Sequence, residues 1–353
     1  MKLHLLLALG AVVHGYLSPR PIRFSKPRPG WSQPLPTAAI NPLFDIVTAN
    51  QVSVNERATM AYYSEHSLAA YCNMFKKPGE YISCKAKCPS IQDRVIIHAT
   101  FEQTGIGGYI AIDHLRHEIV VSFRGSTNIR NYLTDLQFGW SRCHLVPNCL
   151  VHSGFLYAWN DASTIVQSSI VLIRSHHPSY SLVFTGHSLG GAVATLAAAH
   201  LYHDAHISSI VFTYGSPRVG NAAFAAYAQR AARNWRVTHA NDIVPRLPLL
   251  EWGFRHVETE YWLPGDGFGR PYAPPEMRRC EGEMALRCNS GTTGLDIMAH
   301  LVYFHNMVSC MELKIRWRRE SQFENLTQFL DLEDKVAEWE RIDREFAMNG
   351  RHL

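Results

Sequence analysis

Residues 180–202 contain the feature that most constrains the fold, a G-x-S-x-G motif between two stretches of opposite secondary-structure preference. The apolar, β-favouring residues 182–184 come before Gly186, and an alanine- and leucine-rich stretch, residues 192–202, follows the motif. Between a strand and a helix, this motif forms a nucleophile elbow, a sharp turn that raises a serine hydroxyl above the end of a sheet. Glycine two residues before and after Ser188 permits the strained backbone and close packing that such a turn requires. We therefore predict that Ser188 is a nucleophile.

The rest of the chain alternates between strand and helix patterns. Strands are expected at residues 95–101, 108–113, 119–123, 208–214 and 236–239, and helices at 54–72, 155–174 and 221–232. Residues 114–117 resemble a turn, so the second and third strands should form a hairpin. This alternation predicts an α/β fold with a mostly parallel central sheet and helices on both faces.

The N-terminus is typical of an exported protein. Lys2 is followed by an apolar run, residues 3–13, and small residues precede a cleavage position at Tyr16. We expect a signal peptide at residues 1–15, a secreted, extracellular protein, and no transmembrane segment, because eleven apolar residues cannot span a bilayer. Residues 16–49 are rich in proline and are interpreted as a leader or propeptide, or as a strap across the folded domain. A catalytic domain at 50–310 and a helical extension at 311–353 complete the predicted organisation.

Composition excludes some partners. The net charge of +4 is too small to indicate a nucleic-acid partner, and the sequence has no basic helix or aromatic–basic repeat that would support one. No Cys/His cluster or carboxylate pair argues for a metal, and no cofactor is expected. In an exported chain, the eight cysteines should form disulfides. Three pairs lie close in sequence, although sequence alone does not fix the connectivity. These pairs are Cys84 with Cys88, Cys143 with Cys149 and Cys280 with Cys288, which leaves Cys72 and Cys310. Asn325 begins an N-glycosylation acceptor pattern.

A serine hydroxyl needs a base to take its proton and an acid to orient that base. On α/β-hydrolase folds these residues follow the serine in the order acid, then histidine. Asp242 is the preferred acid, because it follows a predicted strand and lies where catalytic groups gather in such sheets. Alternatively, Asp242 only forms a turn. Glu251 and Asp266 are weaker candidates for the acid.

Four histidines follow Asp242 and could act as the base: His256, His300, His305 and His352. His300 is preferred because it lies where a loop becomes a helix. His305 is expected one and a half turns further along the same helix and should face a different side.

Five motifs together resemble the secreted filamentous-fungal lipases of the class 3 family, which includes related feruloyl esterases. The motifs are Phe123-Arg-Gly-Ser126, Phe184-Thr-Gly-His-Ser188-Leu-Gly-Gly191, Tyr214-Gly-Ser-Pro-Arg-Val-Gly220-Asn221, Thr238-His-Ala-Asn-Asp242-Ile-Val-Pro-Arg-Leu-Pro248 and Asp296-Ile-Met-Ala-His300. The similarity covers residues 50–310. It implies an α/β-hydrolase fold with Ser188, Asp242 and His300 as a catalytic triad.

The same resemblance implies an oxyanion hole formed by the amide and hydroxyl of Ser126 and the amide of Leu189. An ordinary turn is the alternative for Ser126. Three disulfides resemble those of the family, 72–310, 84–88 and 143–149, whereas the 280–288 pair is an addition. The tail after Cys310 is longer than the family's ending.

The resemblance further implies a short lid at residues 127–134. Ile129, Tyr132, Leu133 and Leu136 form a one-sided apolar stripe there. Such a lid suits a lipase, although Tyr132 stands where some family lipases have tryptophan, and a helix that merely packs is the alternative. Flanking the acid and base, the residues expected to line an acyl groove are Ile243, Val244, Leu247, Ile297 and Leu301.

Together these features predict a serine ester hydrolase, in the first instance a triacylglycerol lipase that forms an acyl-enzyme at a lipid–water interface. A feruloyl or other carboxylesterase on the same fold is the alternative, and a non-catalytic binding protein is a more distant one. The tail carries an amphipathic helical stripe with Asp331 as the expected N-cap, which either packs on a protein surface or docks on lipid. Its apolar residues are Leu332, Val336, Trp339, Ile342 and Phe346.

Overall fold

The computed structural model describes residues 52–103, 105–126, 139–265, 276–282, 286–294, 296–310 and 322–349. The predicted signal peptide and leader lie outside this part of the chain, as does the apolar stripe predicted for the lid and the residues just after it, Ile129, Tyr132, Leu133 and Leu136. Asn325 falls within a helix, where only the backbone is described.

The central sheet has eight strands in the order β1-β2-β3-β6-β7-β9-β11-β12. They are β1 (Ile96–Gln103), β2 (Ile106–Asp113), β3 (Glu118–Phe123), β6 (Ser181–His187), β7 (Ser209–Tyr214), β9 (Ala232–His239), β11 (Glu260–Leu263) and β12 (Arg278–Cys280). The five strands from β3 to β11 pair in parallel, and β1, β2 and β12 add antiparallel edges. The predicted hairpin is confirmed as β2 and β3, and so is the mostly parallel sheet.

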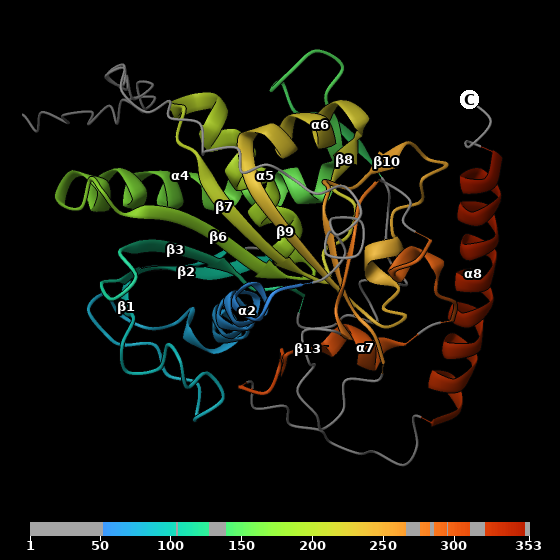
Figure 1. Cartoon of the computed structure of the whole chain (residues 1–353), viewed down its shortest axis with the longest axis horizontal. Coiled ribbons are helices and arrows are strands. Elements are labelled where there is room, and N and C mark those ends of the chain that lie inside the picture. Colours follow the sequence, from blue (N-terminus) through green and yellow to red (C-terminus); the bar gives the residue numbers. More distant parts are fainter. Residues whose placement is uncertain are drawn as a thin grey trace, which may run out of the picture. The chain divides into compact units, whose positions relative to one another are not determined.

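Helices cover both faces of this sheet (Figure 1). They are α2 (Val54–Asn73), α4 (Ser153–His176), α5 (Leu189–Ala205) and α6 (Ala222–Ala231). Val121 of β3 packs in one buried cluster with α4, α5 and α6, whereas the neighbouring Val120 packs in another with Met60 of α2. Because successive strand residues point to opposite faces, these two clusters are the two sides of the sheet.

Helix α2 begins with a capping box. The Ser53 hydroxyl accepts a hydrogen bond from the backbone N–H of Glu56, whose carboxylate accepts one from the Ser53 N–H at 2.8 Å. These bonds satisfy amides that the first turn leaves free, so the start of α2 is fixed locally. Within the described residues, no helix is both long and apolar enough to cross a bilayer.

A second, smaller sheet of short strands was not predicted. It runs in the order β10-β8-β5-β4, with β4 (Trp140–Arg142), β5 (Leu150–His152), β8 (Gly220–Asn221) and β10 (Phe254–Arg255). Strands of two or three residues are too short to produce an alternating apolar pattern, so the sequence carries little sign of them.

Two local predictions were wrong. The short helix α7 (Ile297–Leu301) ends because Val302 takes an extended backbone, and a small hairpin, β13 (Val302–Tyr303) and β14 (His305–Asn306), follows. His305 therefore lies on a strand and not on the helix. The tail helix α8 (Gln322–Asn349) begins nine residues before Asp331, which is thus not its N-cap. The intervening residues contain good helix formers, so the helix extends upstream.

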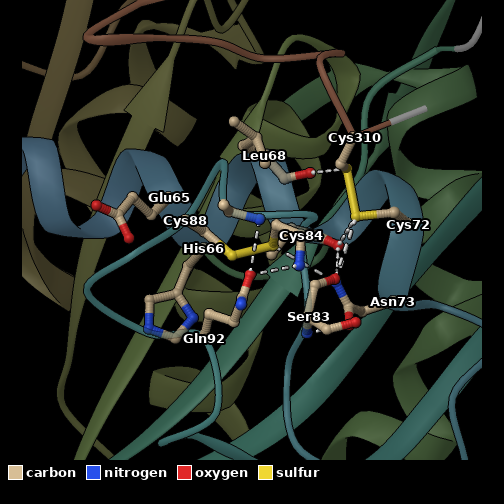
Figure 2. Close-up of a disulfide and its surroundings, with 12 residues drawn as sticks. Glu65, His66, Leu68, Cys72, Asn73, Ser83, Cys84, Cys88, Gln92 and Cys310 are labelled. Carbon is tan, nitrogen blue, oxygen red and sulfur yellow. Dashed lines mark hydrogen bonds between the residues drawn. A yellow bond between two sulfur atoms is a disulfide. The ribbon is translucent and has the colours of Figure 1, made fainter. Parts of the chain in front are cut away.

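Four disulfides join Cys72 to Cys310, Cys84 to Cys88, Cys143 to Cys149 and Cys280 to Cys288. The first of these connects the end of α2 to the segment that follows β14, with Cα atoms 5.8 Å apart (Figure 2). Since Cys310 lies only ten residues after His300, this bond holds the end of the segment that carries the predicted base.

Removing the 72–310 disulfide should destabilise the protein more than removing the 84–88 one. The first closes a loop with a sequence separation of 238 and the second one of 4. In the chain-entropy model, these loops correspond to roughly 5 and about 2 kcal/mol of unfolding free energy. Urea unfolding of Cys72→Ser/Cys310→Ser and Cys84→Ser/Cys88→Ser would measure both, and equal losses would contradict the expectation.

Candidate active site

Ser188 lies on a strained turn between β6 and α5. Its backbone has φ +58° and ψ −129°, a conformation that L-residues rarely adopt. A Cβ at Gly186 would lie 2.3 Å from the backbone of Gly190, and one at Gly190 would lie 2.2 Å from the carbonyl oxygen of Phe123. Both glycines of the motif are therefore required by close backbone approach, as the elbow interpretation expects.

Ser188 lies in the protein interior. Its backbone N–H donates to the carbonyl of Tyr214 at 2.8 Å, and the residue is fully buried. Among the described residues, neither Ser188 Oγ nor Nε2 of His300 has a hydrogen-bond partner. A buried hydroxyl and a buried ring nitrogen that both remain unpaired are groups for which a functional explanation should be sought.

The carboxylate of Asp242, on the loop after β9, accepts three hydrogen bonds within the described residues. Its Oδ1 accepts from the Val244 N–H at 2.9 Å, and its Oδ2 accepts from Nδ1 of His300 at 2.8 Å and from the Tyr303 hydroxyl. Because a carboxylate oxygen only accepts, Nδ1 of His300 carries the proton in this contact. The lone pair of the His300 ring is then at Nε2, the nitrogen that can take a proton from serine.

The backbone around His300 is braced by two other histidines. Helix α7 starts where Asp296 accepts from the Ala299 N–H at 2.9 Å. The carbonyl of His300 lies 2.7 Å from Nε2 of His187, and the carbonyl of Ala299 lies 2.8 Å from Nδ1 of His239. Burial, with a smaller repulsion from His300, holds the pKa of His187 well below its usual range. His187 therefore stays neutral and acts as a hydrogen-bonding brace.

Two glycines, Gly215 and Gly125, allow neighbouring segments to approach the side chains of the site closely. A Cβ at Gly215 would lie 2.9 Å from Asp242 Oδ2 and 3.0 Å from His300 Cε1, so only glycine leaves room for this pair. A Cβ at Gly125 would lie 2.9 Å from Cβ of Ser188. The chain after β3 thus touches the elbow at Gly125, the residue before Ser126.

Comparison with known proteins decides the family. Residues 120–252 match the family model described as lipase (class 3). A secreted mono- and diacylglycerol lipase of Fusarium solani is 41% identical over 301 residues, which cover 84% of this chain and 88% of the relative. A secreted mono- and diacylglycerol lipase of Penicillium cyclopium is 34% identical over 267 residues, covering 72% and 87% respectively.

The chain belongs to the class 3 lipase family.

The fold of this lipase is also that of solved family members. The crystal structure of the mono- and diacylglycerol lipase from Aspergillus oryzae matches with a TM-score of 0.70 at 30% identity, covering 73% of this chain and 100% of that one. The α/β-hydrolase fold and the assignment as a carboxylic ester hydrolase are therefore confirmed. Both curated relatives are named as secreted, in agreement with the predicted export.

Three of the other candidate acids and bases lie within the described residues, and their contacts are with groups other than Ser188, Asp242 and His300. Glu251 is exposed, and His256 is buried with its Nε2 2.7 Å from the carbonyl of Pro245. His305 contacts Ser64 Oγ at 2.9 Å. Asp266 and His352 lie outside the described residues.

The predicted acyl-groove residues separate into two groups. Ile243, Val244 and Leu247 are buried in a cluster that includes apolar side chains of α8, whereas Ile297 and Leu301 are half-buried on α7. Of the predicted oxyanion donors, Leu189 is half-buried at the first position of α5, and Ser126 is half-buried at the end of the segment after β3.

Sequence reasoning missed Tyr303, His187, His239 and Gly215. His187 lies inside the elbow motif, but the motif leaves that position open, so no signal distinguished it. Tyr303 lies three residues after His300, a spacing that would have suggested a helical neighbour and not a donor to Asp242. Each of these roles depends on contacts between segments that are distant in the sequence.

Replacing Tyr303 with phenylalanine should lower kcat about tenfold, because a hydrogen bond to a charged group typically contributes roughly 1.5–3 kcal/mol. The variant removes only the hydroxyl that donates to Asp242 Oδ2. Steady-state hydrolysis of a soluble ester would measure the effect. Tyr109→Phe is a matched control, since that buried hydroxyl contacts His66, outside the site. Equal kcat values for the two variants would show that the Tyr303 contact does not matter for turnover.

Proposed function

We propose that this lipase hydrolyses acylglycerol esters through an acyl-enzyme on Ser188, with His300 as general base and acid and Asp242 as its orienting carboxylate. The observation that carries the proposal is the contact between Asp242 Oδ2 and His300 Nδ1 at 2.8 Å, which leaves the buried Nε2 unpaired among the described residues. That arrangement supplies the tautomer that a serine nucleophile needs.

The reaction proceeds in two halves. In the first, Nε2 of His300 takes the Ser188 proton while Oγ attacks the ester carbonyl, and the protonated ring then gives its proton to the departing glycerol oxygen. In the second, His300 takes a proton from water, the resulting hydroxide attacks the acyl-enzyme, and the fatty acid leaves as Ser188 recovers its proton. Asp242 stabilises the ring whenever it is protonated.

The oxyanion formed in each half is proposed to bind the amide and hydroxyl of Ser126 and the amide of Leu189. Ser126 follows Gly125, which packs against Ser188, and Leu189 is the first residue of α5. The Leu189 amide is thus at a helix N-terminus, where free N–H groups and the helix dipole both favour negative charge. Loss of one such donor typically costs on the order of 100-fold or more in kcat.

The proposed substrates are mono- and diacylglycerols at a lipid–water interface. The names of the Fusarium, Penicillium and Aspergillus relatives support this class, and it refines the triacylglycerol expectation drawn from the sequence. Triacylglycerol and plant-wall ferulate esters use the same chemistry and are therefore alternatives for the same site.

A substrate panel tests the proposal. Emulsified monoolein, diolein and triolein, together with methyl ferulate, would be compared by titrating the released acid, with wild-type protein and its Ser188→Ala variant. Faster hydrolysis of monoolein and diolein, dependent on Ser188, is the expected result. Preference for triolein or for methyl ferulate would retain the mechanism and reassign the substrate, and hydrolysis that persists without Ser188 would overturn the mechanism.

A further inference from the structure

Helix α8 packs against the loop that carries Asp242. Its apolar residues Leu332 and Val336 are buried, with Trp339 and Ile342 beside them. They contact the segment that follows Asp242, namely Ile243, Val244, Leu247 and Leu249. The opposite face of the helix carries exposed ion pairs between Arg341 and the acids Glu338 and Glu345. The apolar stripe therefore packs on the enzyme body, and the ion-paired face of the helix is exposed.

Glu340 on α8 binds both the acid-bearing loop and the segment before the base. Its Oε1 accepts a hydrogen bond from Nη1 of Arg246 at 2.6 Å and another from the backbone N–H of Gly294 at 2.8 Å. Arg246 follows Asp242 by four residues, and Gly294 precedes His300 by six. One carboxylate of the extension thus links the two segments from which the proposed acid and base project.

Arg246 carries this link to the backbone beside the triad. Its Nη2 donates to the carbonyl of Asn241 at 2.9 Å and to that of Gly294 at 2.6 Å, and its Nη1 donates to the carbonyl of Thr292 at 3.0 Å. Asn241 is the residue immediately before Asp242. Burial lowers the pKa of the Arg246 guanidinium, and the Glu340 carboxylate opposes that effect.

Asp343, one turn further along α8, makes an equivalent pair of contacts. Its Oδ2 accepts from Nη1 of Arg218 at 2.8 Å, and its Oδ1 accepts from the Leu250 N–H at 2.7 Å. The same Arg218 nitrogen also donates to the carbonyls of Arg246 at 2.6 Å and Pro248 at 2.7 Å. Both arginines are almost fully buried. The loop from Asn241 to Leu250 is therefore held by two guanidinium groups whose partner carboxylates are on α8.

We propose that Glu340 and Asp343 are positioning residues for hydrolysis, which hold the Asp242 loop and the segment before His300 in their catalytic arrangement. The inference rests on the proposed function of Ser188, Asp242 and His300. The Aspergillus lipase is matched over its whole length by 73% of this chain, so this lipase carries segments with no counterpart there.

Loss of these carboxylates should disturb the triad in a specific way. Removing one partner of a buried ion pair leaves an uncompensated charge, which the protein accommodates by moving. Asp242 is another carboxylate that stabilises the Arg246 charge. Without Glu340, Arg246 is thus expected to be drawn toward Asp242 and to compete with His300 for it. A displacement of about 1 Å in a catalytic group can cost roughly 100-fold in rate.

The test compares two double variants of the full chain. Glu340→Gln/Asp343→Asn removes the two inward carboxylates, and Glu338→Gln/Glu345→Gln removes two exposed carboxylates from the same helix. Hydrolysis of p-nitrophenyl butyrate would be measured, with active sites counted by a fluorophosphonate that labels Ser188. We expect kcat per labelled site to fall about 10- to 100-fold in the inward variant, with KM nearly unchanged. The outward variant should match wild type.

The kcat per labelled site distinguishes a positioning role of Glu340 and Asp343 from a role in the stability of the fold alone. If the inward variant melts at a lower temperature but keeps the kcat of the outward variant, α8 only stabilises the fold and the proposal is overturned. Should the inward double variant not fold, Glu340→Gln and Asp343→Asn alone decide the same question. Glu340→Asp, which keeps the charge, should recover part of the kcat lost in Glu340→Gln. If the wild-type protein showed no Ser188-dependent hydrolysis, the proposed function and this inference would both be overturned. An inward variant with unchanged kcat, in a wild-type enzyme that is active, would overturn this inference alone.

Discussion

Replacing Ser188 with alanine is expected to reduce kcat for ester hydrolysis by at least about 10⁴-fold, since removal of the nucleophile of a serine triad leaves only the contributions of the oxyanion hole and of binding. In the proposed mechanism this hydroxyl forms the acyl bond, so its removal leaves no nucleophile on the elbow. The variant should fold normally. Alanine and serine tolerate the turn at φ +58° about equally, and Ser188 Oγ makes no hydrogen bond within the described residues.

Ser209→Ala is the matched control for this variant. Ser209 is also a buried serine whose Oγ lacks a partner among the described residues, but it lies at the start of β7, whereas the site lies at the other end of that strand. It should keep wild-type kcat. Both proteins would be assayed on p-nitrophenyl butyrate and compared by thermal melting. Substantial activity in a well-folded Ser188→Ala protein would exclude Ser188 as the nucleophile.

The elbow could be predicted because its constraints are local. The motif fixes a strand end, a strained turn and a helix start within a dozen residues, and β6 and α5 have those positions. Asp242 could be chosen because a predicted strand ends just before it. His300 was less certain from its own surroundings, because the helix that carries it has only five residues. The resemblance to a family, and not the residue pattern, gave that assignment its strength.

The contacts that complete the site depend on segments far apart in the sequence. Tyr303 reaches Asp242 across 61 positions, and His187 reaches the carbonyl of His300 across 113. No periodicity links such residues, so a single sequence cannot reveal their pairing. The tail shows the same limit. Its apolar stripe predicted a helix that either packs on a protein surface or docks on lipid, and the sequence does not mark Glu340 and Asp343, whose arginine partners lie 94 and 125 positions away.

The Asp242→Asn substitution should reduce kcat about 10⁴-fold, almost as much as loss of the nucleophile. The amide preserves the size of the side chain, and its oxygen can still accept from the Val244 N–H. Its NH₂ group, however, donates a hydrogen bond toward Nδ1 of His300, where the carboxylate accepted one at 2.8 Å. The ring then carries its proton on Nε2, the nitrogen that must be free to take the proton of Ser188.

Asp113→Asn provides the comparison for this variant. Asp113 is a buried carboxylate that accepts a hydrogen bond from the Tyr62 hydroxyl, and it lies at the end of β2, outside the site. Its replacement should leave kcat unchanged, although it can lower stability. The decisive quantity is again kcat per site labelled by a fluorophosphonate, and the labelling rate of Asp242→Asn should fall along with kcat because the same proton transfer activates Ser188. If Asp242→Asn kept wild-type turnover, His300 would not depend on this carboxylate for its tautomer, and the assignment of Asp242 as the orienting acid would have to be abandoned.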